Sequence, residues 1–276
     1  MTANLELQRV KENRKLRGFR NLLRKENRSW WKTRLWWINT LLWTGLLCGL
    51  LAIMLFGPNN ELQEATAAEI TAAGGELGFI LGVGLNVFFQ FGVPVTAIGV
   101  VVITQGLIIS EQENGLAEWL LSKPVHYRSY VLAKLAANLP PILLLVVGLP
   151  SVVAYGLLSA RMGAPYPAVD FWSAVGIMSI HTIFYLTLTL MLGTIFKKRG
   201  PLLGIALASI LGGGLIGGLI QPLLTITPWN LPEVATLTSI GQALPPQDGI
   251  IPVLATFAWS IVFVWVAVVT FEKFEF

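Results

Sequence analysis

Few side chains in this sequence have the types and the spacing that chemistry requires. The 276 residues include two histidines, His126 and His181, and one cysteine, Cys48, which lie far apart along the chain. No HExxH, GxSxG or GxxxxGK[ST] pattern occurs, so the sequence indicates neither a zinc protease nor a P-loop ATPase. We therefore expect no catalytic residue, no metal site and no cofactor bound by this chain. Cys48, inside an apolar run, is expected to pack as a small apolar residue.

The most polar of the long apolar segments, at about 171–196, contains His181 and Tyr185 among several serines and threonines. Two interpretations stay open. These groups could bond to the backbone and across a helix interface, with His181 as a neutral donor. They could also form the polar lining of a substrate path. A membrane enzyme acting on lipid would have only His181 and Tyr185 as candidates.

The segment at about 110–134 is a different kind of candidate, because it combines acidic, aromatic and basic residues between two apolar runs. Its spacing predicts a short helix over Leu116–Ser122. The apolar face of this helix would consist of Leu116, Trp119 and Leu120. Pro124 disfavours helical geometry at the residue before it, and a new helix is expected to start at Tyr127. Such a rigid element could dock a soluble partner, or it could pack on its own bundle.

The composition describes the surroundings that these residues must share. Hydrophobic residues make up 54% of the chain and charged residues 12%, about half of the ~25% usual in soluble domains. Six apolar segments are predicted to span a membrane, at about 35–56, 77–110, 139–160, 171–196, 201–224 and 250–271. They lack period-two alternation, which favours helices over a barrel. The predicted fold class is therefore all-α, a polytopic membrane protein with six transmembrane helices.

The second apolar run is too long for one straight span. At about 1.5 Å per residue it extends roughly 50 Å, against about 30 Å for the hydrocarbon core. Pro94 divides the run. We therefore expect Gly78–Phe91 to lie at the outer interface or to re-enter, and Val93–Ser110 to cross the membrane.

The basic residues predict the orientation of the spans. All lysines and arginines except Arg161 fall before residue 35, within 111–137, within 197–200 or after the last span. The positive-inside rule places these parts in the cytosol. Scarce charge within the spans argues against an ion-coupled carrier. We expect a multi-pass protein of a bacterial or archaeal plasma membrane (the cell inner membrane), with both termini cytosolic.

The N-terminal arm, residues 1–34, combines basic residues with apolar residues at helical spacing. Those apolar residues are Leu16, Phe19, Leu22 and Leu23, followed by Trp30 and Trp31. The pattern predicts a basic amphipathic helix on the inner leaflet, with tryptophan at headgroup depth. A solvated arm that only sets orientation is the alternative. Nucleic acid is not an expected partner, because the position beside the membrane explains the charge.

Residues 111–134 follow the pattern E-x-E-x-G-x-x-E-x-L-L-S-x-P-V-x-x-R-x-Y-x-x-x-K. This pattern resembles the coupling-helix region of type 2 ATP-binding-cassette (ABC) transporter permeases. The likeness extends over the whole chain, with a basic connecting helix (1–34), a six-span domain (35–276), a coupling segment (111–137) and a long outer segment (225–249). The chain departs from the pattern at Leu116, where the family often has threonine.

The resemblance implies an ATPase-coupling site and a set of partners. Glu111, Glu113 and Gly115 match the start and turn of the motif, Trp119, Leu120, Leu121 and Pro124 match the docking helix and its end, and Arg128, Tyr130 and Lys134 match the return into the third span. It implies an exporter subunit that pairs with a second or related permease and docks two copies of an ATPase, which binds the ATP and Mg. Segment 225–249 would form an outer re-entrant or gate element. An autonomous channel or carrier, or a complex that transmits force or signal instead of cargo, remain alternatives.

Overall fold

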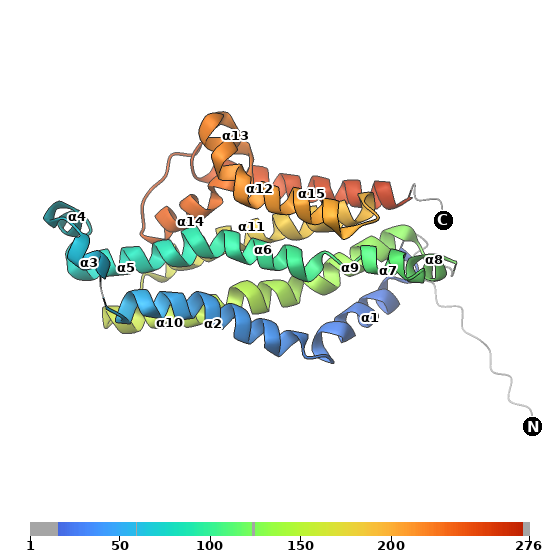
Figure 1. The fold of residues 1–276 in the computed structure, drawn as a ribbon, viewed down its shortest axis with the longest axis horizontal. Helices are drawn as coiled ribbons and strands as arrows, with labels where there is room; N and C mark the ends of the chain where they lie inside the picture. Colours follow the sequence, from blue (N-terminus) through green and yellow to red (C-terminus); the bar gives the residue numbers. More distant parts are fainter. Residues whose placement is uncertain (1–15, 59, 123–124, 273–276) are drawn as a thin grey trace, which may run out of the picture.

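The computed structural model describes residues 16–58, 60–122 and 125–272, and this part of the chain is helical without any strand. Six helical segments in it are long and apolar enough to span a membrane (Figure 1). They are α2 (Leu35–Phe56), the series α5 (Glu76–Asn86), η2 (Val87–Phe91), α6 (Gly92–Thr104) and α7 (Ile109–Glu113), the series α9 (Tyr127–Ile142), η3 (Leu143–Gly148) and α10 (Leu149–Met162), α11 (Ala168–Ile195), α12 (Arg199–Leu219) and α15 (Ile250–Glu272). The predicted all-α fold with six spans is confirmed.

The second span is not divided at Pro94, so the expected break at this residue is wrong. Residues Glu76–Glu113 form one helical segment of 38 residues, about 57 Å long at the α-helical rise. Pro94 lies inside α6, shortly after the π-helical turn η2. A π turn widens the helix and can accommodate the carbonyl groups that a proline leaves unpaired, so the backbone remains satisfied in lipid without a break. Residues 78–91 therefore do not form a separate re-entrant piece.

The third span also combines prolines with a π-helical turn. It begins at Tyr127 instead of at about residue 139, and α9 contains Pro140 and Pro141 near its end. The π-helical turn η3 follows directly and leads into α10. Both long spans thus extend beyond the hydrocarbon core, and the charged residues near their ends, Glu111 and Glu113 in the second span and Arg128 and Lys134 in the third, lie outside it.

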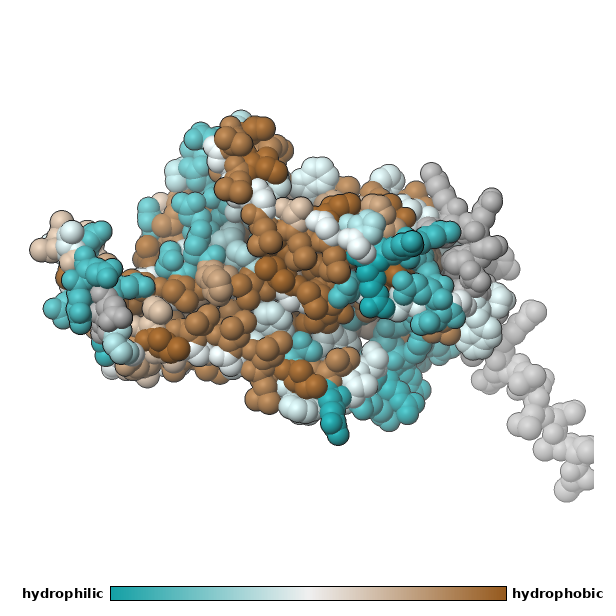
Figure 2. Space-filling model, in the orientation of Figure 1, coloured by the Kyte–Doolittle hydropathy of each residue, from teal (hydrophilic) through white to brown (hydrophobic). Residues whose placement is uncertain are grey.

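Helix α11 is the centre of the bundle. It packs against α6, α14 and α15, and most of its length is buried. In the half distant from α8, the rings of Phe88, Phe89 and Phe171 contact one another, with Phe89 and Phe171 centroids 5.7 Å apart. Helices α2, α12 and α15 lie at the periphery and leave most of their apolar surface exposed. Figure 2 shows apolar side chains over the middle of one face and hydrophilic side chains toward its two ends, as expected for a bundle surrounded by lipid.

Short helices cover the end of the bundle that lies away from α8 (Figure 1). They are α3 (Asn60–Glu64), α4 (Ala67–Ala72), α13 (Gln221–Ile226), the 3-10 turn η4 (Pro228–Asn230) and α14 (Leu231–Ser239). Helix α14, within the predicted outer segment, is largely buried against α11. The indole of Trp229 lies directly on Gly213 of α12, where any added Cβ would overlap it.

Helix α1 (Phe19–Trp31) confirms the helix predicted in the N-terminal arm but corrects its surroundings. Its buried face, Leu22, Glu26 and Trp30, packs against α9. The indole N–H of Trp30 donates to Oδ1 of Asn138 at 2.7 Å, so this tryptophan is buried between α1 and α9 and does not face lipid headgroups. The spacing of four residues brings all three side chains onto one side of the helix. Trp31, by contrast, is exposed.

Candidate functional site

The candidate site lies at the end of the bundle that contains α1, α7, α8 (Leu116–Leu121) and the last turn of α15, which we call the α8 end (Figure 1). Helix α8 confirms the short helix predicted for this segment. Gly115 joins α7 to α8 with φ of +66°, a conformation that costs glycine far less than any other residue. The chain therefore turns sharply here, and α8 extends from the bundle as a separate element.

Below α8, five side chains form a buried charge cluster, which consists of Lys25 and Glu26 of α1, Glu111 of α7, and Tyr130 and Lys134 of α9. Glu111 is the shared acceptor. It receives Lys25 Nζ at 2.7 Å, the Tyr130 hydroxyl at 2.6 Å and Lys134 Nζ at 3.0 Å. Lys134 also lies 3.2 Å from Glu26. The cluster thus joins three helices that are distant in sequence.

Burial gives these ion pairs their importance. The Lys134 side chain is only 3% exposed and that of Glu111 14%, so neither charge can be satisfied by water alone. Two carboxylates and two ammonium groups balance one another, as a buried ion network requires. Burial alone would lower the pKa of Lys25, but its hydrogen bond to Glu111 and the charges of Glu111 and Glu26 raise it above the usual value. The pairing thus favours the charged form of Lys25.

The cluster also reaches the last span. The ring of Tyr130 stacks on Phe271 of α15, with centroids 4.7 Å apart and planes 4° from parallel. Lys134 Nζ also lies over the Tyr130 ring, 5.0 Å from its centroid. Tyr130 therefore connects the start of the third span to the end of the sixth.

A comparison with protein families matches residues 20–275 to the family described as ABC-2 family transporter protein. This match covers α1, the α8 end and all six spans. The chain belongs to this family. Members of this family are transport subunits, so the chain is a membrane-spanning permease subunit of an ABC transporter. A comparison with curated proteins finds no match.

The geometry separates the predicted coupling residues of this permease into inner and outer sets. Glu111 and Tyr130 belong to the charge cluster and contact α1, α9 and α15 within this chain; a direct contact of either residue with the ATPase stays a prediction. Trp119 is 56% exposed on α8, whereas Leu120 is half-buried and packs against the apolar residues around Tyr130. The predicted shared face of Leu116, Trp119 and Leu120 is thus divided, with Trp119 turned outward.

The remaining predicted residues differ in how firmly they are held. Glu113 is exposed and lies 3.7 Å from Arg199 of α12, a surface pair that contributes little. Arg128 is exposed, and its Nε donates to the hydroxyl of Tyr127 at 3.2 Å. Pro124 lies outside the described residues, and Leu121 is described only by its backbone at the end of α8.

The loop that returns from α8 to α9 is anchored to α1. The backbone N–H of His126 donates to the carbonyl of Arg17 at 3.1 Å, and its Nδ1 accepts the N–H of Arg128 at the start of α9 at 3.3 Å. Gly18, with φ of +84°, brings the backbone of the N-terminal segment against Val125. His126 is therefore an N-cap of α9 that also holds this loop in place.

His181 and Tyr185, predicted either as structural groups or as a substrate path, lie on one side of α11 with ring centroids 4.9 Å apart. His181 is only 3% exposed, and its Nδ1 has no hydrogen-bond partner among the described residues. The Tyr185 hydroxyl lies 3.3 Å from Oγ of Ser209, which also accepts from Trp229 at 3.4 Å. Both rings are packed between helices within one protomer.

Sequence reasoning missed two members of the site, Lys25 and Glu26, and treated Lys134 only as a motif position. Glu26 is a single acidic residue among the bases of α1, on the same face as Leu22 and Trp30. An acid on the apolar face of a basic helix was the one available signal that the helix meets a buried cation. Among the described residues, no three His, Cys, Asp or Glu side chains come together in a metal-binding group.

Proposed function

We propose that this permease binds a separate ATPase subunit through α8 and moves a substrate out of the cell with the energy of ATP hydrolysis. The observation that carries the proposal is the contrast between α8 and its support. Trp119 is exposed on an element that extends from the bundle, while Glu111 directly before it is fixed by three partners. Exposed tryptophans on rigid supports are frequent energetic centres of protein interfaces.

The charge cluster gives α8 a mechanical connection to the membrane spans. Force applied to α8 reaches α7 directly, α1 and α9 through Glu111, and α15 through the stack of Tyr130 on Phe271. Because the buried ions resist separation, we expect these elements to tilt together as a rigid body. ATP and Mg would be bound by the ATPase, whose closure would drive this movement.

The proposed complex contains two permeases and two ATPase subunits in a bacterial or archaeal plasma membrane. The bases that gather at the α8 end support a cytosolic position for that end, where an ATPase is accessible. Peripheral α12 and α15 expose apolar surface along most of their length, which would be available to a second or related permease. The substrate path would then lie between the two permeases.

The experiment is affinity purification of the tagged full-length permease from its native membranes in mild detergent. We expect a P-loop ATPase in stoichiometric amount with the wild type. Trp119→Asp should lower the amount of ATPase by at least about tenfold, since it places a charge at the centre of an apolar contact. Trp31→Asp is the matched control. Trp31 is another exposed tryptophan of the α8 end, and its replacement should leave the ATPase bound.

Three results would count against the proposal. Undiminished ATPase with Trp119→Asp would remove α8 as the docking element. Equal loss with both variants would mean that any added acid at this end disturbs the complex. A homo-oligomer without any ATPase in the wild-type preparation would favour an autonomous channel or carrier.

A further inference from the structure

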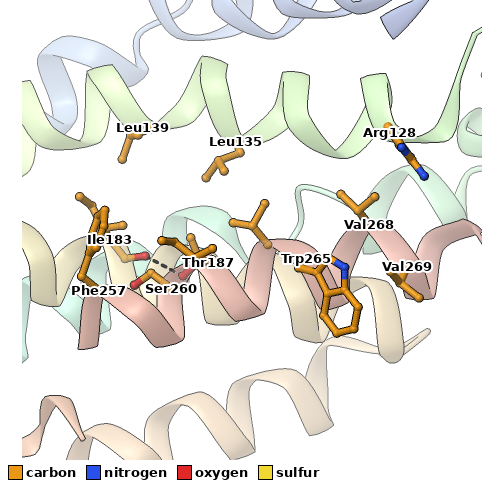
Figure 3. Close-up of a pocket in the computed structure, with 12 residues that line it drawn as sticks. Arg128, Leu135, Leu139, Ile183, Thr187, Phe257, Ser260, Trp265, Val268 and Val269 are labelled. Atoms are coloured by element: carbon orange, nitrogen blue, oxygen red, sulfur yellow. Dashed lines mark hydrogen bonds between the residues drawn. The ribbon is translucent and has the colours of Figure 1, made fainter. Parts of the chain in front are cut away.

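A groove runs between α9, α11 and α15 on the side of the bundle toward the α8 end (Figure 3). Its volume is about 480 Å³, within the ~300–1,000 Å³ usual for small-molecule sites. The walls are apolar side chains, among them Leu135 and Leu139 of α9, Ile183 of α11, and Val264 of α15. Arg128 is the one charged residue in its lining. In Figure 3 Arg128 lies at one end of the row of lining residues and Leu139 toward the other.

The hydroxyls of the two polar residues in the middle of the groove already donate to backbone carbonyls, so neither offers a free donor. The hydroxyl of Thr187 donates to backbone carbonyl oxygens of its own helix, at 3.0 Å from Ile183 and 2.9 Å from Phe184. Ser260 donates to the carbonyl of Thr256 at 2.9 Å. An occupant therefore meets an apolar wall beyond Arg128. A peptide would leave its backbone groups unpaired there, whereas a hydrocarbon chain would not.

The length and depth of the groove match one leaflet. From Arg128 to Leu139 the α9 helix rises about 16 Å, and half of a hydrocarbon core is about 15 Å. Arg128 lies level with Val268 and Val269, close to the end of α15 at Glu272. This places its guanidinium near the headgroups when the apolar part of α15 spans the bilayer.

Arg128 has no ion pair among the described residues. No carboxylate oxygen of the described residues lies within 4 Å of a guanidinium nitrogen of Arg128. The guanidinium contacts Tyr127, whose ring centroid is 5.6 Å from the guanidinium carbon. The Glu272 carboxylate is directed toward Tyr127 instead. In a second copy of this chain, the exposed helices α2 and α12 contain no acidic residue, so they would not supply this anion. Lipid phosphates occur at this depth throughout the leaflet.

We propose that this groove binds an anionic glycerophospholipid, with one acyl chain along α9 and α15 and the phosphate on the guanidinium of Arg128. Planar guanidinium groups recognise phosphate by paired, charge-assisted hydrogen bonds. The occupied groove would fix the spacing of the third and sixth spans, the same two that Tyr130 and Phe271 connect. The site stands whether or not α8 binds an ATPase.

The test is native mass spectrometry of the full-length protein in detergent, titrated with dioleoylphosphatidylglycerol or dioleoylphosphatidylcholine. We expect one tight phosphatidylglycerol per chain, bound about tenfold more tightly than phosphatidylcholine, as for one added charge-assisted contact. Arg128→Gln should abolish this preference. Arg20→Gln is the matched control, since Arg20 is an exposed base of α1 at the same end and should leave the preference intact.

A second pair of variants tests the groove itself. Val264→Trp fills it and should reduce the binding of both lipids, whereas Val262→Trp, on the exposed side of α15, should not. Equal affinity for the two lipids in the wild type, or a preference that persists in Arg128→Gln with an unchanged unfolding temperature, would overturn the proposal.

The groove could instead be covered by a second copy, and a disulfide experiment in native membranes distinguishes this case. Cys48 is the one cysteine of the chain, so a Cys48→Ala background leaves Val264→Cys as the one thiol. Efficient formation of a disulfide-linked dimer upon oxidation would mean that the groove faces another copy and would overturn the lipid site. A monomer that stays unlinked, and that binds phosphatidylglycerol as described, supports it.

Discussion

The charge cluster at the α8 end and the polar face of α11 both bury polar side chains, but these side chains find their hydrogen-bond partners in different places. In the cluster, Glu111 meets partners from α1 and α9, far away in sequence. On α11, the hydroxyls of Thr182 and Thr189 donate to carbonyls one turn earlier in their own helix, and Nδ1 of His181 has no hydrogen-bond partner in the described part of the chain. The cluster therefore specifies how helices assemble, whereas these threonine hydroxyls of α11 bond only within their own helix.

The largest expected effect comes from breaking the cluster. Lys134→Met removes the buried cation shared by Glu111 and Glu26 and leaves them only the half-exposed Lys25; loss of one partner of a buried ion network typically costs about 3–5 kcal/mol. We expect a loss of that size in the free energy of unfolding, measured by titration with sodium dodecyl sulfate. A cost below about 1 kcal/mol would mean that water replaces the ammonium group and that the cluster is not a structural connection.

A smaller effect is expected on α11. His181→Leu replaces a buried ring, whose Nδ1 has no hydrogen-bond partner among the residues that the structure describes, with an apolar side chain, so the free energy of unfolding should change by no more than about 1 kcal/mol. Asn138→Leu is the contrasting variant, because it removes the acceptor of the Trp30 indole and should cost about 1–3 kcal/mol. Loss of the assembled protein in His181→Leu would contradict this interpretation of α11. Normal assembly with lost transport would support the substrate path instead.

The smallest effect distinguishes the exposed member of the cluster from the buried ones. The Lys25 side chain is 44% exposed, so Lys25→Met should cost only about 0.5 kcal/mol. Because the pKa of Lys25 is raised by folding, this contribution is complete below the unfolded value of 10.5 and is lost as pH rises through the higher folded pKa. Unfolding titrations of wild type and Lys25→Met should therefore converge at high pH. A difference that grows with pH would contradict the pairing.

Local patterns predicted much of the fold. The apolar segments predicted six spans, Pro124 and the spacing before it predicted α8, and α9 starts at Tyr127 as expected. These features depend on neighbours in sequence. The continuity of the second span did not follow from Pro94, because relief by the π turn η2 depends on backbone geometry that composition does not encode.

The sequence predicted where the candidate site lies along the chain, but not which of its residues are buried and which are exposed. The motif identified Glu111, Trp119 and Tyr130, but the pattern cannot tell which of them faces inward. Glu111 is an exposed acid by its local sequence and a buried ion by its tertiary contacts with Lys25 and Lys134. These groups come together only because α1 packs on α9. Nothing in the sequence near Glu111 predicts that helix contact, so the burial of Glu111 could not be predicted.

The π turns η2 (Val87–Phe91) and η3 (Leu143–Gly148) have a consequence for how the spans tolerate changes in length. Each π turn contains about one residue more than an α turn. Deleting one residue within it can restore an α-helix while both flanking halves keep their facing. Helix α11 contains no π turn that could absorb a deletion. A one-residue deletion there would rotate every following side chain by about 100° around the helix axis. We therefore expect a one-residue deletion to be tolerated better within these two π turns than within α11.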